Sequence, residues 1–309
     1  MNNEISRFAP STTGPAHPGT LLAALLCWLD ARSRGADIIL RLENLDPDRC
    51  QPAFAEAMIT DLAWLGLSFD VVEWQSQQHA RHVAAMDYLA DKGLLYPSTF
   101  SRRDLEMLGR RTPDGGWAYD NRERGKPLPV GGWRACTEPL RVQLPDEEFS
   151  PLDESGCDLR QTPTLAFGDP IVRRRDGAFA YHLVAVVDDA ACGVTHVVRG
   201  RDIATSTATQ VALQQVLGLP TPQYRHHFLL LEQRERKLAK LHGSIGLPVL
   251  RQFYDAPTLC GWLAHVAGLA PAGTTCLPTE LVRDFSWERV QTHDVLVQWN
   301  GQELMVAHD

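Results

Sequence analysis

A segment rich in proline and glycine, residues 7–20, leads directly into the apolar run of residues 21–29. Its three prolines and two glycines prevent a continuous helix or a long strand. The segment is therefore predicted to be a tight connection that brings His17 to the first turn of a helix. Backbone N–H groups and the helix dipole favour a phosphate at such a turn, and His17 can add a donor. Taken alone, a His-x-Gly sequence is more often an ordinary strand-to-helix loop with a capping threonine.

The composition excludes several classes of protein. With 309 residues the chain is long enough for a large core and two domains. Its net charge of −8 indicates no general affinity for nucleic acid, so any such contact must be local. Residues 1–4 lack the pattern of a signal peptide, and the longest apolar run is too short to span a membrane. The seven cysteines are scattered without any Cys-x-x-Cys, which argues against a disulfide framework and a zinc knuckle. We expect a reduced, cytoplasmic enzyme.

The pattern of the first hundred residues predicts an α/β fold. Residues 20–34 are predicted to be a helix that is apolar on most faces, and therefore buried, with Gly35 at its end. Residues 37–43 follow as a short strand, and further helices are expected at 52–66 and 77–93. This alternation predicts a parallel sheet with crossover helices and a ligand site at the carboxyl ends of the strands.

Between residues 97 and 178 the sequence becomes rich in Gly, Pro and Arg, which indicates a small inserted subdomain. Weak antiparallel strands are expected near residues 138–144 and 170–174. The basic residues of this stretch form either a solvated loop surface or a patch that contacts a nucleic-acid backbone. They are Arg102, Arg103, Arg110, Arg111, Arg122, Arg124, Lys126, Arg173, Arg174 and Arg175.

The α/β pattern resumes after residue 179. Residues 180–189 are predicted to be an apolar strand or helix with Tyr181 near its start, and residues 196–200 a strand with Arg199 near its end. The elements expected beyond them are a helix at 204–217, a strand at 228–231, a basic loop at 234–240, a mainly helical stretch at 245–287 and a hairpin around Asn300-Gly301.

Five short motifs in series resemble those of the class I glutamyl-tRNA synthetases. Each is weak alone, but their order and spacing match that family from residue 5 to about residue 287. The motifs are RFAPSTTGPAHPG at residues 7–19, RLENLD at 41–46, VDD at 187–189, HVVRG at 196–200 and KLAK at 237–240. Because the chain ends soon after the helical stretch that follows the last motif, it is most similar to the truncated branch of the family, the glutamyl-Q tRNA(Asp) synthetases.

The resemblance implies a Rossmann-like class I catalytic core without an anticodon-binding domain. Residues 1–96 and 179–244 would form its two halves, residues 97–178 the inserted connective subdomain, and residues 245–309 a helical segment and tail. It also implies the reaction: glutamate is activated with ATP and Mg²⁺ as glutamyl-adenylate and then attached to the queuosine base in the anticodon of tRNA(Asp). For a catalytic unit of this size we expect a monomer.

The residue types suit adenylate formation, in which a carboxylate attacks the α-phosphate of ATP and pyrophosphate leaves. Negative charge grows on the phosphate oxygens, so positive donors must be in place. By the resemblance the catalytic residues are His17, Lys237 and Lys240, which also bind ATP together with Gly14 and Gly19. His17 would serve the α-phosphate, and the two lysines would follow the departing phosphates with Mg²⁺. Taken alone, the lysine pair would be a solvated charged loop.

Glutamate offers two carboxylates and one ammonium group to a binding site. A guanidinium can bind a carboxylate through two parallel hydrogen bonds, so Arg7 and Arg199 suit the carboxylates. Glu43 suits the ammonium group. By the resemblance, Ser11 and Tyr181 complete the amino-acid site.

Three residues depart from the family pattern near the ATP site. Thr12 stands where the family has proline, Asn44 where it has aspartate, and Ala239 where it has serine, so a hydroxyl near the phosphates is lost. We expect these changes to weaken activity. Arg41 and Glu43 also have a simpler interpretation, as an exposed ion pair at the end of a strand.

The zinc site of the family is altered more deeply. Members that bind zinc have Cys-x-Cys after a Leu-Tyr pair, and a tyrosine and a further cysteine later. Here Ser98 and Phe100 hold the first two positions, and Tyr119 is followed by Glu123. Phe100 cannot ligate a metal, and the remaining oxygen donors make a poor zinc site. We therefore expect no structural zinc.

Two alternative functions stay open at this point. The chain could pass activated glutamate to an acceptor other than queuosine. It could also be a non-catalytic tRNA-binding or regulatory relative, which the substitutions near the ATP site allow.

Overall fold

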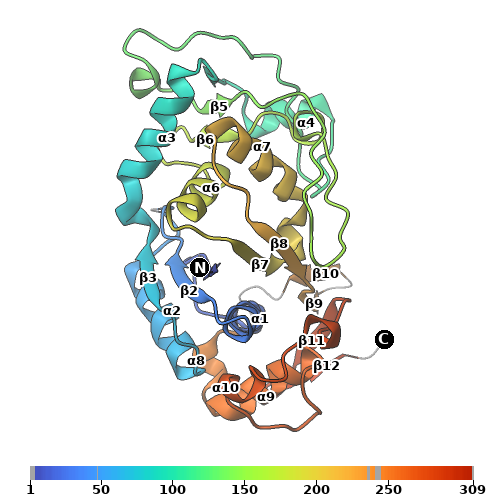
Figure 1. Cartoon of the computed structure of the whole chain (residues 1–309). Helices are drawn as coiled ribbons and strands as arrows, with labels where there is room; N and C mark the ends of the chain where they lie inside the picture. The colour runs from blue at the N-terminus through green and yellow to red at the C-terminus, as the bar shows by residue number, and fades with distance from the viewer. Residues whose placement is uncertain (1–3, 47, 235–236, 241–244, 308–309) are drawn as a thin grey trace. The chain divides into compact units, whose positions relative to one another are not determined.

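The computed structural model describes residues 4–46, 48–234, 237–240 and 245–307, and for residues 233–234 and 237–240 it describes the backbone alone. Within the described residues the chain forms two compact units. Figure 1 labels the helices and strands that make them up. The first unit comprises residues 1–75, 196–201 and 225–309, and the second comprises residues 76–195 and 202–224.

A five-stranded sheet follows the order β3-β2-β1-β7-β8. The pairs β1–β2, β2–β3 and β1–β7 are parallel, so the predicted Rossmann-like parallel sheet is confirmed. The carboxyl ends of β2, β1 and β7 therefore lie at one edge of the sheet, where ligands bind in such folds. The strands are β1 (Ile5–Phe8), β2 (Asp37–Leu42), β3 (Val71–Trp74), β7 (His196–Gly200) and β8 (Gln223–His227).

The helix that follows β1 buries most of its residues inside the first unit. This helix, α1 (Pro18–Ser33), contacts β1, β2 and β7 and also contacts α9 (Ala256–Val266) and α10 (Pro278–Leu281). Its neighbours on several sides explain why its sequence is apolar on most faces. The chain leaves α1 through Gly35, whose φ of +67° favours glycine, as predicted. Five of its leucines are at most 1% exposed, namely Leu21, Leu22, Leu25, Leu26 and Leu29.

The second unit contains a small antiparallel sheet in the order β4-β5-β6, as expected for the inserted stretch. Helices α3, α6 and α7 pack against one another in the same unit. For the segment 180–189 the sequence allowed either a strand or a helix, and the structure shows the helix α6. The elements of this unit are α3 (His79–Asp91), β4 (Leu95–Pro97), α4 (Arg102–Leu108), β5 (Leu140–Val142), α5 (Pro163–Ala166), β6 (Ile171–Arg173), α6 (Tyr181–Ala191) and α7 (Thr207–Leu217).

A second sheet of the first unit runs in the order β10-β9-β11-β12. It joins the basic segment of the sequence to the tail, because β9 pairs with β10 on one side and with β11 on the other. The tail hairpin is confirmed: Asn300 Oδ1 accepts hydrogen bonds from two turn N–H groups, and Gly301 has a φ of +104°. The strands are β9 (Leu230–Arg234), β10 (Lys237–Lys240), β11 (Val295–Trp299) and β12 (Leu304–Val306).

Two predictions in this region were wrong in extent. The expected strand at 228–231 is not a single strand. β8 ends at His227, β9 begins at Leu230, and residues 228 and 229 lie between the two strands. Between them the N–H of Leu229 donates to Oδ1 of Asp294 over 2.6 Å instead of continuing the ladder of the first sheet. The basic segment at 234–240 was expected to be a loop, but residues 237–240 form a strand.

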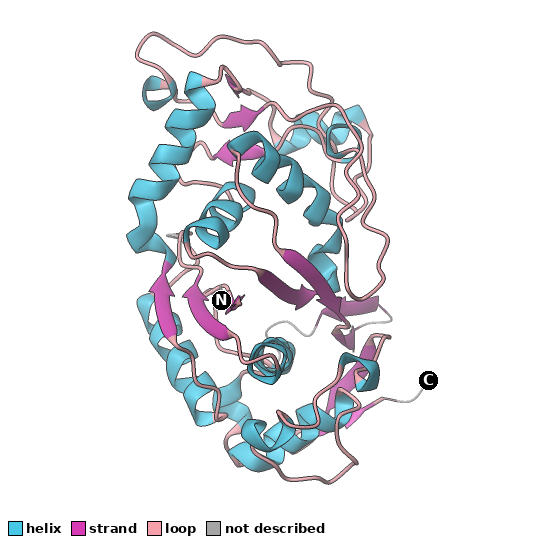
Figure 2. Cartoon of the chain, in the orientation of Figure 1, coloured by secondary structure: helices cyan, strands magenta, loops and turns pink. Residues whose placement is uncertain are grey.

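Besides the long helix α2 (Pro52–Trp64), the remaining helical elements are single short turns. Figure 2 shows how helices and strands alternate along the chain. No helix in the described part of the chain is long and apolar enough to cross a membrane, and all seven cysteines are free thiols. The remaining helices are α2 (Pro52–Trp64), α8 (Leu247–Leu250), and the 3₁₀ turns η1 (Gln75–Gln78), η2 (Trp133–Ala135), η3 (Arg201–Ser206) and η4 (Trp287–Arg289).

Candidate active site

His17 is the N-cap of α1, and its side chain folds back over the first turn of that helix. The N–H of Thr20 donates a hydrogen bond to Nδ1 of His17 over 3.3 Å. Gly19 leaves room for the ring, since a Cβ there would lie 3.1 Å from Cε1 of His17. The histidine thus lies at the helix start, as predicted, and it rather than a threonine caps the helix.

This capping bond fixes the proton of a neutral His17 ring. Because Nδ1 accepts from Thr20, the ring proton is on Nε2, which can donate to an anion. Few backbone donors are left at this turn, because Pro18 has no N–H and the N–H of Thr20 is bound to the ring. The positive groups that this turn presents to an anion are therefore mainly the imidazole Nε2–H and the helix dipole.

Arg7 lies on β1 with its side chain tied to the neighbouring strand. It is 7% exposed, and its Nη1 donates to the carbonyl oxygen of Val198 on β7 over 3.3 Å. From α1, Sγ of Cys27 donates to the carbonyl oxygen of Arg7 over 3.1 Å. Burial raises the pKa of the Cys27 thiol to about 12, so it stays a protonated donor at neutral pH. Strand β1 is thus held from both the sheet and the helix.

Ser11 and Glu43 are brought side by side at the carboxyl ends of β1 and β2, where they form an isolated parallel bridge. The N–H of Glu43 donates to the carbonyl oxygen of Pro10 over 3.0 Å. Both the N–H and the hydroxyl of Thr12 donate to the carbonyl oxygen of Glu43 over 3.2 Å. Thr12, which departs from the family pattern, is fully buried and therefore helps to hold this edge closed.

Arg199 on β7 has a partner that the sequence analysis missed. Its Nε donates to Nε2 of His226 on β8 over 3.0 Å, and both side chains are buried. The bond requires an unprotonated Nε2, so a neutral His226 carries its proton on Nδ1. His226 lies outside the strand predicted at 228–231, and only the order of the strands in the structure brings it beside Arg199.

The interpretation of Arg41 and Glu43 as an exposed ion pair was wrong. Arg41 is 1% exposed, and its Nε lies 2.8 Å from Oε2 of Glu73. The two residues are directly opposite in the parallel register of β2 and β3. Arg41 is therefore a buried cross-strand partner of Glu73.

For the other predicted site residues the structure shows a position in the fold, and their part in the sheet edge described above stays a prediction. Gly14 lies in the loop before His17, and a Cβ there would meet nothing within 4 Å. Tyr181 belongs to the second unit, where it begins α6 and is 39% exposed. Lys237 and Lys240 lie on β10, and their side chains are outside the described part of the structure.

The structure thus gathers five predicted residues at one edge of the parallel sheet: Arg7, Ser11, His17, Glu43 and Arg199. They come from the ends of β1, β2 and β7 and from the first turn of α1. The edge offers two guanidinium groups, an imidazole donor and one carboxylate. Such a set can bind a small molecule that carries both carboxylate and ammonium groups beside a phosphate.

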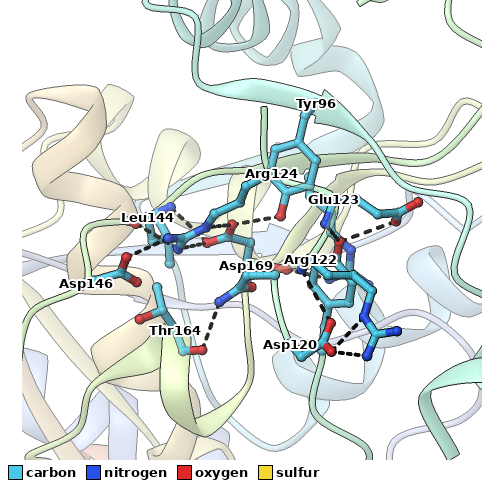
Figure 3. Close-up of polar contacts among 12 residues, drawn as sticks. Tyr96, Asp120, Arg122, Glu123, Arg124, Leu144, Asp146, Thr164 and Asp169 are labelled. Atoms are coloured by element: carbon cyan, nitrogen blue, oxygen red, sulfur yellow. Dashed lines mark hydrogen bonds and ion pairs between the residues drawn. The ribbon is translucent and has the colours of Figure 1, made fainter. Parts of the chain in front are cut away.

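Most of the basic residues of the insert contact acceptors of the chain itself, and the choice between a solvated loop surface and a nucleic-acid contact patch stays open. Arg124 contacts Asp146 and Asp169, as Figure 3 shows. Further ion pairs are Arg122–Asp120, Arg174–Asp176 and Arg175–Glu138. Arg102 and Arg103 begin α4 and are exposed.

Comparisons with known proteins identify the family of the chain. Residues 5–256 match the family of class I tRNA synthetases (E and Q), catalytic domain. The glutamyl-Q tRNA(Asp) synthetase of Thiobacillus denitrificans is 37% identical over 300 residues, which are 95% of this chain and 97% of the relative. That of Neisseria meningitidis serogroup C is 40% identical over 297 residues, which are 94% and 98% of the two chains.

Solved structures share the fold at lower identity. The glutamate tRNA ligase of Elizabethkingia meningosepticum superposes with a TM-score of 0.75 at 21% identity, over 94% of this chain and 66% of the ligase. The glutamate-tRNA synthetase of Elizabethkingia anophelis gives a TM-score of 0.77 at 21% identity, over 97% and 69%. This chain thus spans about two thirds of the length of these enzymes. Motifs, fold and relatives together show that the chain is a ligase of the class I aminoacyl-tRNA synthetase type and belongs to the glutamyl-Q tRNA(Asp) synthetases.

Proposed function

We propose that this protein activates glutamate with ATP as glutamyl-adenylate and transfers the glutamyl group to the queuosine base in the anticodon of tRNA(Asp). The observation that carries the proposal is the edge of the parallel sheet, to which the start of α1 contributes His17 and the ends of β1, β2 and β7 contribute Arg7, Glu43 and Arg199. The names of relatives that align over nearly the whole chain support the acceptor. We propose a monomeric, cytoplasmic enzyme.

In this proposal the glutamate lies against the ends of β1, β2 and β7. The guanidinium groups of Arg7 and Arg199 bind its carboxylates, and Glu43 binds its ammonium group. Val198 and His226 orient the two arginines through the hydrogen bonds at 3.3 and 3.0 Å. Preorientation of this kind reduces the entropy that is lost when the substrate binds. Ser11 is the further residue of this edge proposed to bind glutamate, and Tyr181 is proposed as a glutamate-binding residue from the family resemblance alone.

The adenylation step needs positive donors around the phosphates of ATP, which is taken with Mg²⁺. The substrate carboxylate attacks the α-phosphorus, the bond to the bridging oxygen breaks, and pyrophosphate leaves with the electron pair. Nε2–H of His17 donates to the α-phosphate, Gly14 and Gly19 let the backbone approach, and Lys237 and Lys240 neutralise the leaving group. Donors fixed in advance act at the moment when charge develops, without reorganisation.

Two assays test the proposal in turn. Glutamate-dependent exchange of label between pyrophosphate and ATP, without tRNA, tests activation; its absence at millimolar glutamate would leave a non-catalytic tRNA-binding relative. Transfer of labelled glutamate to queuosine-containing tRNA(Asp), but not to the transcript without queuosine, tests the acceptor. Equal transfer to both, or to neither in the presence of exchange, would point to another acceptor.

Three variants assign the residues. Arg7→Ala and Arg199→Ala are each expected to weaken glutamate binding by roughly 10- to 100-fold, since each removes a charged hydrogen bond. Lys240→Ala is expected to slow exchange by about 10²- to 10³-fold with little change in the KM for glutamate. The exposed Lys92→Ala is the matched control and should leave both values unchanged. Normal exchange by Lys240→Ala would remove the lysine from the proposed mechanism.

A further inference from the structure

The four positions that correspond to the zinc ligands of the family lie together in this chain. The hydroxyl of Ser98 donates to Oε2 of Glu123 over 2.7 Å, and the hydroxyl of Tyr119 lies 3.3 Å from the same oxygen. The ring of Phe100 packs edge-on against Tyr119 with 5.6 Å between ring centroids. We refer to Ser98, Phe100, Tyr119 and Glu123 as the ligand-position cluster. The backbone has therefore kept the geometry that would bring four ligands to one point.

The side chains of the ligand-position cluster do not fit zinc. Structural zinc sites use four ligands, mostly thiolates and imidazoles, in a tetrahedral arrangement. Phe100 offers no donor atom, Ser98 and Tyr119 offer neutral hydroxyls, and Glu123 is the single anion. Within the described residues, no group of three or more His, Cys, Asp and Glu side chains is placed to hold a metal ion.

The carboxylate of Glu123 is instead surrounded by donors from the protein. It is 4% exposed and accepts from the hydroxyl of Thr99 over 2.8 Å and from the backbone N–H of Thr99 over 3.2 Å. Nζ of Lys126 lies 2.5 Å from Oε1 of Glu123, the oxygen that also accepts from the hydroxyl of Thr99. The ammonium group of Lys126 is therefore bound to the carboxylate of Glu123, which is the one anionic side chain of the ligand-position cluster.

A second positive side chain, from strand β5 of the small sheet, contacts the ligand-position cluster. Arg141 on β5 is 4% exposed, and its Nε donates to the hydroxyl of Ser98 over 3.1 Å. Its guanidinium carbon lies 3.9 Å from the ring centroid of Tyr119, a distance at which cation and ring attract each other. Two positive side chains thus surround one carboxylate and two neutral hydroxyls.

We propose that Lys126 and Arg141 take the place of the metal ion in this chain. Arg141 joins β5 to Ser98 and Tyr119, and Glu123 joins its own segment to Ser98 and Thr99. The ammonium group of Lys126, three residues from Glu123, supplies the positive charge that balances the carboxylate. Together these contacts do the task of a zinc ion with four ligands. The insert then folds and keeps its shape without any metal. This inference does not depend on the proposed enzymatic activity.

The first test uses the unaltered protein, produced with added zinc and then dialysed. We expect far less than one zinc ion per chain by elemental analysis, and the same midpoint of thermal unfolding with and without a chelator. Roughly one retained zinc ion per chain, together with a lower midpoint in chelator, would overturn the proposal.

The second test rebuilds the site with the triple variant S98C/F100C/E123C, which leaves Tyr119 in place. If the four positions converge as described, three thiolates and the tyrosine should bind zinc or cobalt with a stoichiometry of about one, and cobalt should show a thiolate charge-transfer band. The matched control S98A/F100A/E123A should bind neither metal. A soluble, folded S98C/F100C/E123C protein that binds no metal would show that the ligand-position cluster does not have the geometry described here.

The third test concerns Lys126, one of the two cations proposed to take the place of the metal ion. Lys126→Ala should lower the midpoint of thermal unfolding by about 2–4 °C, and zinc should not restore it. Lys126→Arg should keep the midpoint close to that of the unaltered protein, since it keeps the charge. The exposed Lys92→Ala serves as the matched control in the same unit. A Lys126→Ala protein with an unchanged midpoint would remove the ammonium group from the proposed role.

Discussion

The middle of α1 is built from buried leucines, whereas arginines and a tyrosine surround Asp169 in the insert. Leu21, Leu25 and Leu29 are fully buried. Asp169 is also fully buried, and its carboxylate accepts from Tyr96 over 2.7 Å, from Arg124 over 2.6 and 2.8 Å, and from the N–H of Leu144 over 3.0 Å (Figure 3). Both regions are closed to solvent, but different forces hold them together.

The difference follows from the amount of regular structure in each region. The sheet and helices of the first unit can bury large apolar side chains, and this burial is favourable without any particular direction. The strands of the insert are only three residues long, so its chain segments are joined by directed contacts between charged groups. A buried ion pair adds little net stability as a whole, but the loss of one partner leaves an uncompensated charge. The insert should therefore be the more sensitive region to single polar changes.

The largest effect is expected for Asp169→Ala. The change leaves Arg124 and Tyr96 without their buried acceptor, so we expect a loss of about 4 kcal/mol in the free energy of unfolding. Denaturation in urea measures the total loss, and hydrogen exchange of residues 118–173 shows where it occurs. The control Asp176→Ala removes an exposed pair with Arg174 and should cost at most about 1 kcal/mol. Equal losses for the two variants would contradict the comparison.

A somewhat smaller effect is expected for Leu25→Ala in α1. Deletion of a fully buried leucine side chain costs about 3 kcal/mol through lost burial and the cavity that is left. The loss should appear as faster hydrogen exchange in β1 and β2 and should not change with salt concentration. Leu25→Met, which conserves volume, should cost under about 1.5 kcal/mol. A salt-dependent loss for Leu25→Ala would show that polar contacts matter in this core too.

Acid should weaken the insert before it weakens the sheet. Burial acts to raise the pKa of Glu123, but hydrogen bonds from Lys126, Ser98 and Thr99 outweigh it and lower this pKa from 4.5 to about 2. The stabilisation by the ionised carboxylate is therefore complete above pH 4.5 and is lost as the pH falls toward 2. Unfolding measured between pH 5 and pH 2 should show this dependence, and Glu123→Gln should reduce it. An unchanged dependence in Glu123→Gln would show that other carboxyl groups cause it.

The smallest effect concerns a local device of the insert. Ser101 and Asp104 form a capping box at the start of α4, with 2.8 Å between the N–H of Ser101 and Oδ2 of Asp104. Ser101→Ala should cost about 1 kcal/mol, visible as faster exchange within α4 alone. Ser101→Thr should retain most of the cap. A loss that spread to the small sheet would mean that α4 is coupled to the rest of the insert.

The sequence predicted those elements whose pattern is local and periodic. The apolar helix at 20–34, the strand at 37–43 and the hairpin around Asn300-Gly301 were found with small shifts in their ends. The helix begins two residues earlier than expected because His17 caps it and Pro18 occupies its first turn. Caps of this kind are set by one or two side chains and leave little periodic signal.

Polar pairs between distant segments could not be predicted in the same way. The contact of Arg199 with His226, that of Arg41 with Glu73, and the surroundings of Asp169 depend on which strands become neighbours. Such pairs follow from the order of the strands, because residues far apart in sequence meet only after the sheet has formed. The family motifs supplied the candidate site residues, and the structure added His226 and the role of Thr12.

The tail hairpin has a practical consequence for work with this protein. β11 forms a parallel ladder with β9, and β9 in turn pairs with β10, the strand of Lys237 and Lys240. β9 lies between β10 and β11. An affinity tag or truncation that pulled β11 away would therefore leave one edge of β9 unpaired, and the lysine strand β10 is bonded to the opposite edge of that same strand. Fusions at the carboxyl terminus should therefore disturb the proposed ATP-dependent activation, measured as pyrophosphate exchange, more than fusions at the amino terminus.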